Sequence, residues 1–215
     1  MDSIKSVGFD LDGTLYSLSS EMNNRVRDKI SAKILDKNPS LKDINNARIF
    51  FEKEYKKIPS ATKILKQIGY SDASKIMDEC LAQADILDLI PPNKKLEEVL
   101  KKISLKYPEM YLLTSSPEEL ALSKLERIGI DKNLFSYKLY SDTPNVGSKS
   151  DGTSFDYALS LSKFHASEHA YFGDNKESDI LPARAKGMKT IAVHNKIPEA
   201  DFYISEINEI RSLLL

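Results

Sequence analysis

Asp10 and Asp12, two positions apart, are the first residues along the chain that could do chemistry. They follow the apolar stretch 4–9, which predicts a buried strand running into a loop. In an α/β sheet, ligands bind at the carboxyl ends of the strands. Two acids at such an end would attract a cation, although the run Asp-Leu-Asp-Gly also suits a simple turn.

A second polar group follows the apolar run 110–113. Thr114 and Ser115 stand at the end of this predicted strand, and Ser116 is predicted to cap a helix with Pro117 in its first turn. The amide groups at the start of a helix favour anions. The hydroxyls therefore indicate an anion site, but they are equally suited to capping alone.

Three charged residues lie further along the chain. Lys149 precedes a predicted helix that contains Phe155. Asp174 ends a predicted strand, and Asp179 follows it shortly. Taken singly, a lysine is usually solvent-exposed and a Gly-Asp pair is usually a turn. These residues indicate a functional site only if the fold brings them close to Asp10.

The elements expected between these residues alternate. Strands are predicted at 4–9, 110–113, 137–140, 170–172 and 190–193, with a sixth candidate at 202–204. Helical patterns of apolar residues separate the later strands. Such alternation is typical of a parallel sheet with helices on both faces. The predicted fold is a doubly wound, Rossmann-like α/β core.

Residues 18–90 break this alternation with four successive helical stripes. The second stripe is predicted to start behind Ser40, which has Asp43 at the capping-box spacing, and the third behind Ser60. The fourth is predicted to run from Ile76 to Leu87. The sequence therefore predicts an all-helical cap domain at 18–90, inserted into a core domain of 1–17 and 91–215.

The composition is that of an ordinary globular protein: 215 residues, 41% hydrophobic and 29% charged, with a formal charge of −1. Such a balance excludes a global attraction to nucleic acid or to an anionic membrane. The single cysteine, Cys80, cannot form an internal disulfide, and no apolar run reaches the length of a membrane span. We expect a cytoplasmic protein with neither nucleic acid nor membrane as partner; the sequence does not indicate its oligomeric state.

Jointly and in this order, the segments resemble the signature of the haloacid dehalogenase-like (HAD) hydrolase superfamily. The first motif of that family, Asp-x-Asp-Gly-Thr, matches residues 10–14 in full, and its second falls on Thr114. Lys149 resembles the third-motif lysine, although the usual neighbouring prolines are replaced. Asp174 and Asp179 fit the fourth motif. The resemblance covers roughly 1–17 and 91–205, and many relatives carry a helical cap where this chain has its insert.

The resemblance implies a phosphatase that acts on a small phosphorylated metabolite, such as a nucleotide or sugar phosphate. Asp10 would attack phosphorus, because a carboxylate is already ionised at neutral pH. Asp12 would serve as acid and base, helped if crowded carboxylates raise its pKa. By analogy with the family, Asp10, Asp174 and the backbone carbonyl of Asp12 would hold Mg²⁺, the cation that oxygen ligands suit.

The remaining polar residues are given supporting roles by the same resemblance. Thr114, Ser115 and Lys149 would hold the transferring phosphoryl oxygens. Asp179 would orient Lys149 or a water on the metal. Tyr16 and the run 85–89 look similar to the pyrimidine 5′-nucleotidase branch, which often has Asn at the position of Gly13.

Other functions stay open. A phosphomutase of the same superfamily uses every group named above, whereas a dehalogenase needs the first aspartate but neither Asp12 nor a metal. His165, Glu168 and His169 match the spacing of a zinc peptidase family in which two histidines on one helix bind the metal, although the predicted loop there is short. A catalytically silent binding module is the last alternative.

Overall fold

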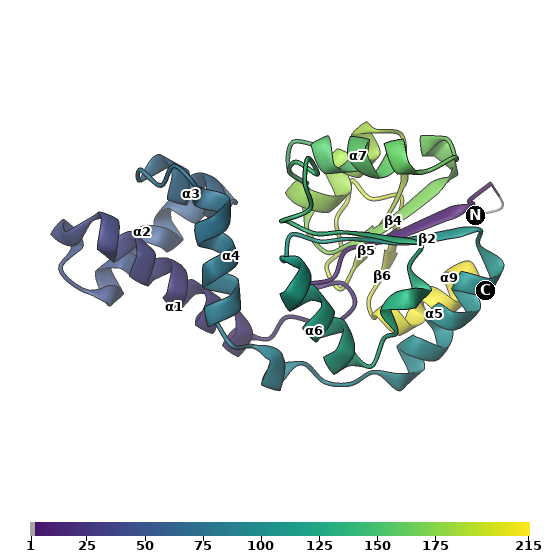
Figure 1. Ribbon diagram of the computed structural model, residues 1–215, viewed down its shortest axis with the longest axis horizontal. Coiled ribbons are helices and arrows are strands. Elements are labelled where there is room, and N and C mark those ends of the chain that lie inside the picture. The colour runs from purple at the N-terminus through teal and green to yellow at the C-terminus, as the bar shows by residue number, and fades with distance from the viewer. Residues whose placement is uncertain (1–2) are drawn as a thin grey trace. The chain divides into compact units, whose positions relative to one another are not determined.

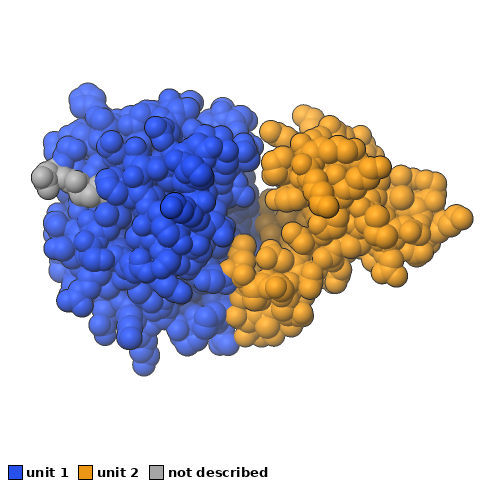
Figure 2. Space-filling view, turned by 180° about the vertical axis from the view of Figure 1, so that it is seen from behind, with its two compact units in different colours: residues 1–17, 90–215 blue, residues 18–89 orange. Residues whose placement is uncertain are grey.

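The computed structural model describes residues 3–215, which divide into two compact units. Unit 1 comprises residues 1–17 and 90–215, and unit 2 comprises residues 18–89 (Figure 2). The predicted boundary at residue 91 lies next to Ile90, where unit 1 resumes. Unit 2 is therefore an insertion between the first strand and the rest of the sheet.

Unit 1 is built on a six-stranded sheet in which every pairing is parallel. The strands are β1 (Ser6–Phe9), β2 (Glu109–Leu113), β3 (Tyr137–Leu139), β4 (His169–Gly173), β5 (Lys189–Val193) and β6 (Phe202–Ile204). Their order is β3-β2-β1-β4-β5-β6, so the chain leaves β1 in one direction and later resumes on its other side. Ligands bind where the strand order reverses in this way. In this sheet that position is the carboxyl end of β1 and β4.

Helices cover both faces of the sheet, as the alternating pattern predicted (Figure 1). One face carries α5 (Lys94–Lys106), α6 (Glu118–Ile128) and α9 (Ile210–Leu214), and the other carries α7 (Thr153–Leu161) and α8 (Leu181–Ala185). Phe155 and Ala183 from the latter pair pack on Tyr111 and Tyr171 of the sheet. Position 8 requires a glycine, because the ring of Tyr111 fills the space that a Cβ atom would need. The doubly wound α/β fold is confirmed.

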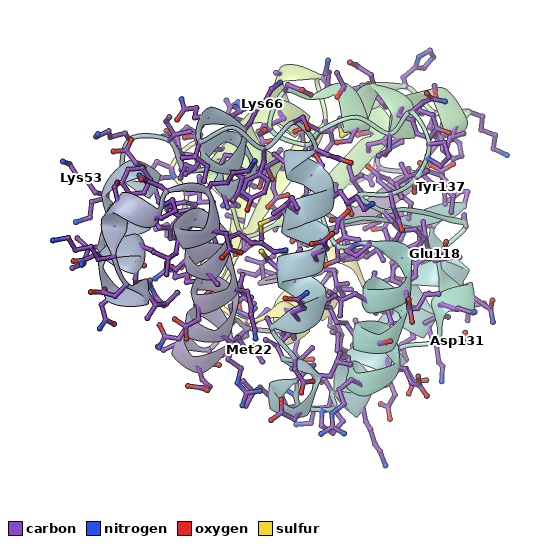
Figure 3. The ribbon with its side chains drawn as sticks, turned by 60° about the vertical axis from the view of Figure 1, so that its left-hand side comes forward. Met22, Lys53, Lys66, Glu118, Asp131 and Tyr137 are labelled. Atoms are coloured by element: carbon purple, nitrogen blue, oxygen red, sulfur yellow. The ribbon has the colours of Figure 1, made fainter. Side chains whose placement is uncertain are left out.

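Unit 2 contains four helices, α1 (Ser20–Lys37), α2 (Ile44–Tyr55), α3 (Ala61–Gln67) and α4 (Ala73–Gln83). Their apolar stripes meet in one cluster, whose buried members are Ile30, Ile34, Ala47, Phe51, Ile64, Leu65, Ala73 and Cys80. The polar faces point outward, with Lys53 on α2 and Lys66 on α3 exposed (Figure 3). Each unit therefore has an apolar core of its own.

Two details of unit 2 differ from the sequence-based expectation. Ser40 does not cap the second helix, because it lies inside the 3₁₀ turn Pro39–Leu41. Asp43 is the cap instead, and its Oδ1 accepts a hydrogen bond from the Asn46 amide at 2.8 Å. The fourth helix ends at Gln83 rather than near residue 87, since Asp85 adopts a φ of 48°, outside the helical range.

Within residues 3–215, no helix is both long enough and apolar enough to cross a membrane.

Candidate active site

The polar residues singled out in the sequence gather at the carboxyl edge of the sheet. Asp10 follows β1, Thr114 follows β2 and Asp174 follows β4. The Nζ atom of Lys149, from the loop before α7, donates to Oδ1 of Asp10 at 2.6 Å. Lys149 also forms an ion pair with Asp179, and both of these side chains are almost fully buried. Segments distant in sequence thus meet around Asp10.

Asp10, Asp174 and Asp179 form a group that could hold a metal ion. Each offers one carboxylate oxygen, and the three oxygens lie within 4.8 Å of one another. Asp179, for which only a supporting role was predicted, contacts Lys149 and also belongs to this group. Three carboxylates facing one lysine leave an excess of negative charge, which a bound divalent cation would compensate.

Burial and the excess of negative charge raise the pKa values of two of these acids. Burial, opposed by Lys149 and reinforced by the charges of Asp179 and Asp12, raises the pKa of Asp10 to about 7. Burial and the neighbouring charges of Asp10 and Asp179 raise the pKa of Asp174 to about 8. All-oxygen donors are typical of Mg²⁺, so the residues present fit this ion.

Two glycines let the backbone pass close to these acids. Gly13 has a φ of 83°, and a side chain there would overlap with the carboxyl group of Asp174. A side chain at Gly173 would overlap with Asp179 in the same way. The loop after β1 is therefore pressed against the loop after β4, which places the backbone around Asp12 beside Asp174.

The side chain of Asp12 points away from this acidic group. Its Oδ1 accepts a hydrogen bond from Lys124 Nζ at 2.5 Å and a very short one from the Tyr16 hydroxyl. Its Oδ2 accepts one from Ser116 Oγ at 2.7 Å. The carboxylate of Asp12 is not part of the group that could hold a metal, and the backbone carbonyl that the resemblance implies as a ligand stays a prediction.

The ionisation of Asp12 differs from the expectation. Burial acts to raise its pKa, but the charge and hydrogen bond of Lys124, with the bonds from Tyr16 and Ser116, hold the pKa below its usual value. A pKa raised by crowded carboxylates would have helped the acid role of Asp12. The pKa is lowered instead, because the carboxylate is hydrogen-bonded to a buried lysine.

The start of α6 also differs from the expectation. Ser116 does not cap this helix, because its hydroxyl is bound to Asp12. Asp142 accepts a hydrogen bond from the Glu118 amide at 3.0 Å instead. Thr114 is buried and its Oγ1 accepts a hydrogen bond from the Ser116 amide at 3.1 Å, whereas Ser115 is exposed.

Three functional contacts escaped the sequence-based reasoning: Lys124 and Tyr16 on Asp12, and Thr14, whose Oγ1 donates to Asp10 Oδ2 at 3.2 Å. Lys124 did leave a signal in the sequence. It lies between Ala121 and Ile128 on the buried stripe of α6, where a lysine is out of place. A charged residue on an apolar helix face predicts a buried ionic partner.

The zinc peptidase alternative lacks the geometry that it needs. His169 lies in β4 and is fully buried, while His165 precedes the short 3₁₀ turn Ala166–Glu168. The two histidines therefore do not lie on one face of a helix. Among the described residues 3–215, the group that could hold a metal is the aspartate group, with neither histidine in it.

Comparison with known proteins defines the class. The chain matches the family described as "Hydrolase: haloacid dehalogenase-like hydrolase" over residues 4–187. The chain therefore belongs to the haloacid dehalogenase-like hydrolases, and it is an enzyme of that superfamily. No sequence among the curated proteins matches it significantly.

Three solved structures illustrate the likeness in fold. A HAD phosphatase from Thermococcus onnurineus has a TM-score of 0.66 at 19% identity, and a 2-haloacid dehalogenase from Pseudomonas syringae pv. Tomato has 0.58 at 22%. The HAD-hydrolase YfnB from Bacillus subtilis, bound to magnesium, has 0.64 at 15%. Each alignment covers 98% of both chains. The comparisons give no support to the resemblance to the pyrimidine 5′-nucleotidase branch.

Proposed function

We propose that this enzyme hydrolyses a small phosphomonoester, such as a nucleotide or sugar phosphate, in a Mg²⁺-dependent reaction that passes through an aspartyl-phosphate on Asp10. The observation that carries the proposal is the group formed by Asp10, Asp174 and Asp179, with oxygens within 4.8 Å of one another and Lys149 beside them. A nucleophilic carboxylate beside a cation site suits an anionic phosphate ester. The presence of Asp12 favours this chemistry over dehalogenation.

The first step transfers the phosphoryl group to the enzyme. An oxygen of Asp10 attacks the phosphorus atom, the bond from phosphorus to Asp10 forms, and the bond to the leaving oxygen breaks. Because the pKa of Asp12 is held below its usual value, Asp12 is ionised before the substrate binds and first takes a proton from the monoanionic phosphate ester. It then donates this proton to the leaving oxygen, which departs as an alcohol. Asp10 attacks in its ionised form, which a bound Mg²⁺ would favour by offsetting the burial and the neighbouring charges that raise the pKa of Asp10 to about 7. An ionised carboxylate is already a nucleophile, so no base is needed to activate it.

The second step restores the enzyme. Asp12, now ionised, takes a proton from a water molecule that attacks the phosphorus of the aspartyl-phosphate. The bond from phosphorus to Asp10 breaks, and the electron pair stays on the carboxylate. Inorganic phosphate leaves together with the proton that Asp12 took from water, and Asp10 and Asp12 return to their initial ionised states.

Positive charge and hydrogen-bond donors stabilise the transferring group. Lys149 and the hydroxyls of Thr114 and Ser115 would contact the phosphoryl oxygens, where negative charge is concentrated. Asp10, Asp174 and Asp179, with the backbone carbonyl of Asp12, would hold Mg²⁺, whose charge would offset the repulsion between the carboxylates and the phosphate ester.

Phosphate release from a panel of phosphorylated metabolites, together with p-nitrophenyl phosphate, tests the proposal. We expect Mg²⁺-dependent release that EDTA abolishes, and Asp10→Asn should lower kcat by roughly 10⁴-fold or more. Asp36→Asn is the matched control, because Asp36 is exposed on α1. Unchanged hydrolysis in Asp10→Asn would exclude Asp10 as the nucleophile. Transfer of labelled phosphate between two hydroxyls without net release would indicate a mutase instead.

A further inference from the structure

Lys124 is a fully buried lysine in the middle of α6. A buried ammonium group is unfavourable unless a negative charge and hydrogen-bond acceptors compensate it. Its Nζ atom has two such partners, Asp12 Oδ1 at 2.5 Å and Ser116 Oγ at 2.8 Å. The whole length of this side chain thus serves to bring one ammonium group to Asp12.

The contacts of Lys124, Ser116 and Asp12 close a ring. Lys124 donates to both Asp12 Oδ1 and Ser116 Oγ, while Ser116 Oγ donates to Asp12 Oδ2 at 2.7 Å. The Tyr16 hydroxyl adds a second donor on Oδ1. Three donors from two separate segments hold one carboxylate, so its orientation is fixed.

The two oxygens of Asp12 are not equivalent within this ring. A carboxylate offers about four lone-pair sites, two on each oxygen. Lys124 and Tyr16 occupy both sites of Oδ1, whereas Ser116 occupies one site of Oδ2. The Asp12 side chain keeps 27% of its surface exposed, while that of Lys124 is fully buried. The free site of Oδ2 is thus the one that a substrate oxygen or a water can use.

We propose that Lys124 is a positioning residue that saturates Oδ1 of Asp12 and so leaves Oδ2 as the oxygen that exchanges a proton with the leaving group. The inference rests on the proposed function, since it names the oxygen of Asp12 that carries out the acid and base step of that reaction and the residue that positions it. Lys124 acts through Asp12 and does not touch the substrate.

The ring can accommodate the proton without breaking. When Oδ2 carries a hydrogen in its free site and donates it to the leaving oxygen, its other site still accepts from the Ser116 hydroxyl, which in turn accepts from Lys124. When Oδ2 is ionised, the same two hydrogen bonds persist, as observed. The proton therefore moves between Asp12 and the substrate or water alone.

The leaving group separates this role from a merely structural one. An alkyl phosphate needs a proton on its leaving oxygen, whereas p-nitrophenolate departs as a stable anion. Because kcat/KM covers the reaction only as far as phosphoryl transfer to Asp10, the later base role of Asp12 does not enter this parameter. Lys124→Met should lower kcat/KM about 100-fold for an alkyl phosphate of the hydrolysed panel and less than about 5-fold for p-nitrophenyl phosphate.

Three other variants complete the experiment. Lys124→Gln keeps a hydrogen-bond donor and should recover part of the loss on the alkyl ester. Tyr16→Phe removes the other donor on Oδ1 and should also lower kcat/KM more for the alkyl ester than for p-nitrophenyl phosphate, by a smaller factor. This variant tests whether donors on Oδ1 position Asp12 even if circular dichroism shows that Lys124→Met does not fold. Lys102→Met is the matched control, because Lys102 is exposed on α5, and both substrates should react as with the wild type.

The outcomes distinguish a failure of the role inferred for Lys124 from a failure of the proposed phosphatase function on which it rests. Wild-type protein that releases phosphate neither from the panel of metabolites nor from p-nitrophenyl phosphate overturns the proposed function and the role of Lys124 with it. An active wild type, with folded Lys124→Met and Tyr16→Phe variants that lose equal factors on both esters or lose nothing, overturns the role of Lys124 alone.

Discussion

The ammonium group of Lys149 lies 2.6 Å from Oδ1 of Asp10, and the two side chains are only 5% and 7% exposed. The same ammonium group contacts Asp179, so one cation stands between two buried acids. It also lies 5.7 Å from the centre of the Tyr171 ring, whose electron-rich face favours a cation. Lys149 therefore balances charge in the folded protein before any substrate arrives.

Lys149→Met should separate this structural role from the proposed catalytic one. Removing the ammonium group leaves Asp10 and Asp179 buried without their cation, so we expect the free energy of unfolding in EDTA to fall by about 3–5 kcal/mol. The loss of a donor to the phosphoryl group should lower kcat/KM by about 10²- to 10³-fold. Urea denaturation and phosphate release measure the two effects. Lys149→Met/Asp179→Asn should regain part of the stability and none of the activity; a fully active Lys149→Met would exclude the catalytic role.

Mg²⁺ should stabilise the protein through the aspartate group. At a concentration 100 times its Kd, a ligand that binds only the folded state adds about 2.7 kcal/mol, which corresponds to roughly 5–10 °C in Tm for a chain of this size. Thermal denaturation with and without MgCl₂ measures the shift, and EDTA should reverse it. Asp174→Asn should remove most of the shift and Asp36→Asn none of it. An equal shift in all three proteins would place the binding elsewhere.

The elements that carry the site could be predicted from the sequence because their signals are local. The run 4–9 followed by Asp10 and Asp12 is typical of a strand and the loop at its end. The alternation of strands and helices predicts a parallel sheet, which brings Thr114 and Asp174 to the same edge. Strand periodicity and the position of polar residues at strand ends suffice for that inference.

The direction in which each side chain points could not be predicted. Ser116 has the sequence context of a helix cap, yet its hydroxyl binds Asp12, and Asp142 caps α6 from a distant loop. The partner of Asp12 is Lys124, separated from it by 112 positions. Which of several local hydrogen bonds forms depends on packing between segments far apart in sequence, and no local pattern encodes that choice.

The thiol of Cys80 should be inert in the folded protein. Cys80 lies fully buried in the apolar cluster of unit 2, and burial raises the pKa of its thiol to about 11. Thiolates are the reactive form, so a thiol reagent at pH 8 should react only as fast as the helices open. Leu105 is 89% exposed, and Leu105→Cys should add one thiol that reacts at once. Fast reaction of Cys80 in the wild type would show that unit 2 is open in solution.

His169 should make stability depend on pH below neutrality. It is fully buried in β4 with its ring edge-to-face on Tyr111 at 5.9 Å, and burial, opposed by the charge of Glu109 and the backbone of Phe164, lowers its pKa. The folded state therefore prefers neutral histidine, whereas the unfolded chain takes up a proton near its ordinary pKa of about 6.5. The stabilisation from this group is present above about pH 6.5 and is lost as the pH falls toward the folded pKa.

The difference in unfolding free energy between wild type and His169→Gln measures this dependence. Denaturation between pH 5 and 7.5 in saturating Mg²⁺ keeps the titration of the active-site acids out of the comparison. We expect wild type to lose more stability than His169→Gln as the pH falls, even though the variant starts from a lower value. His165→Gln, at an exposed position, should follow the wild type. Parallel curves for wild type and His169→Gln would mean that His169 takes up its proton equally in the folded and unfolded states.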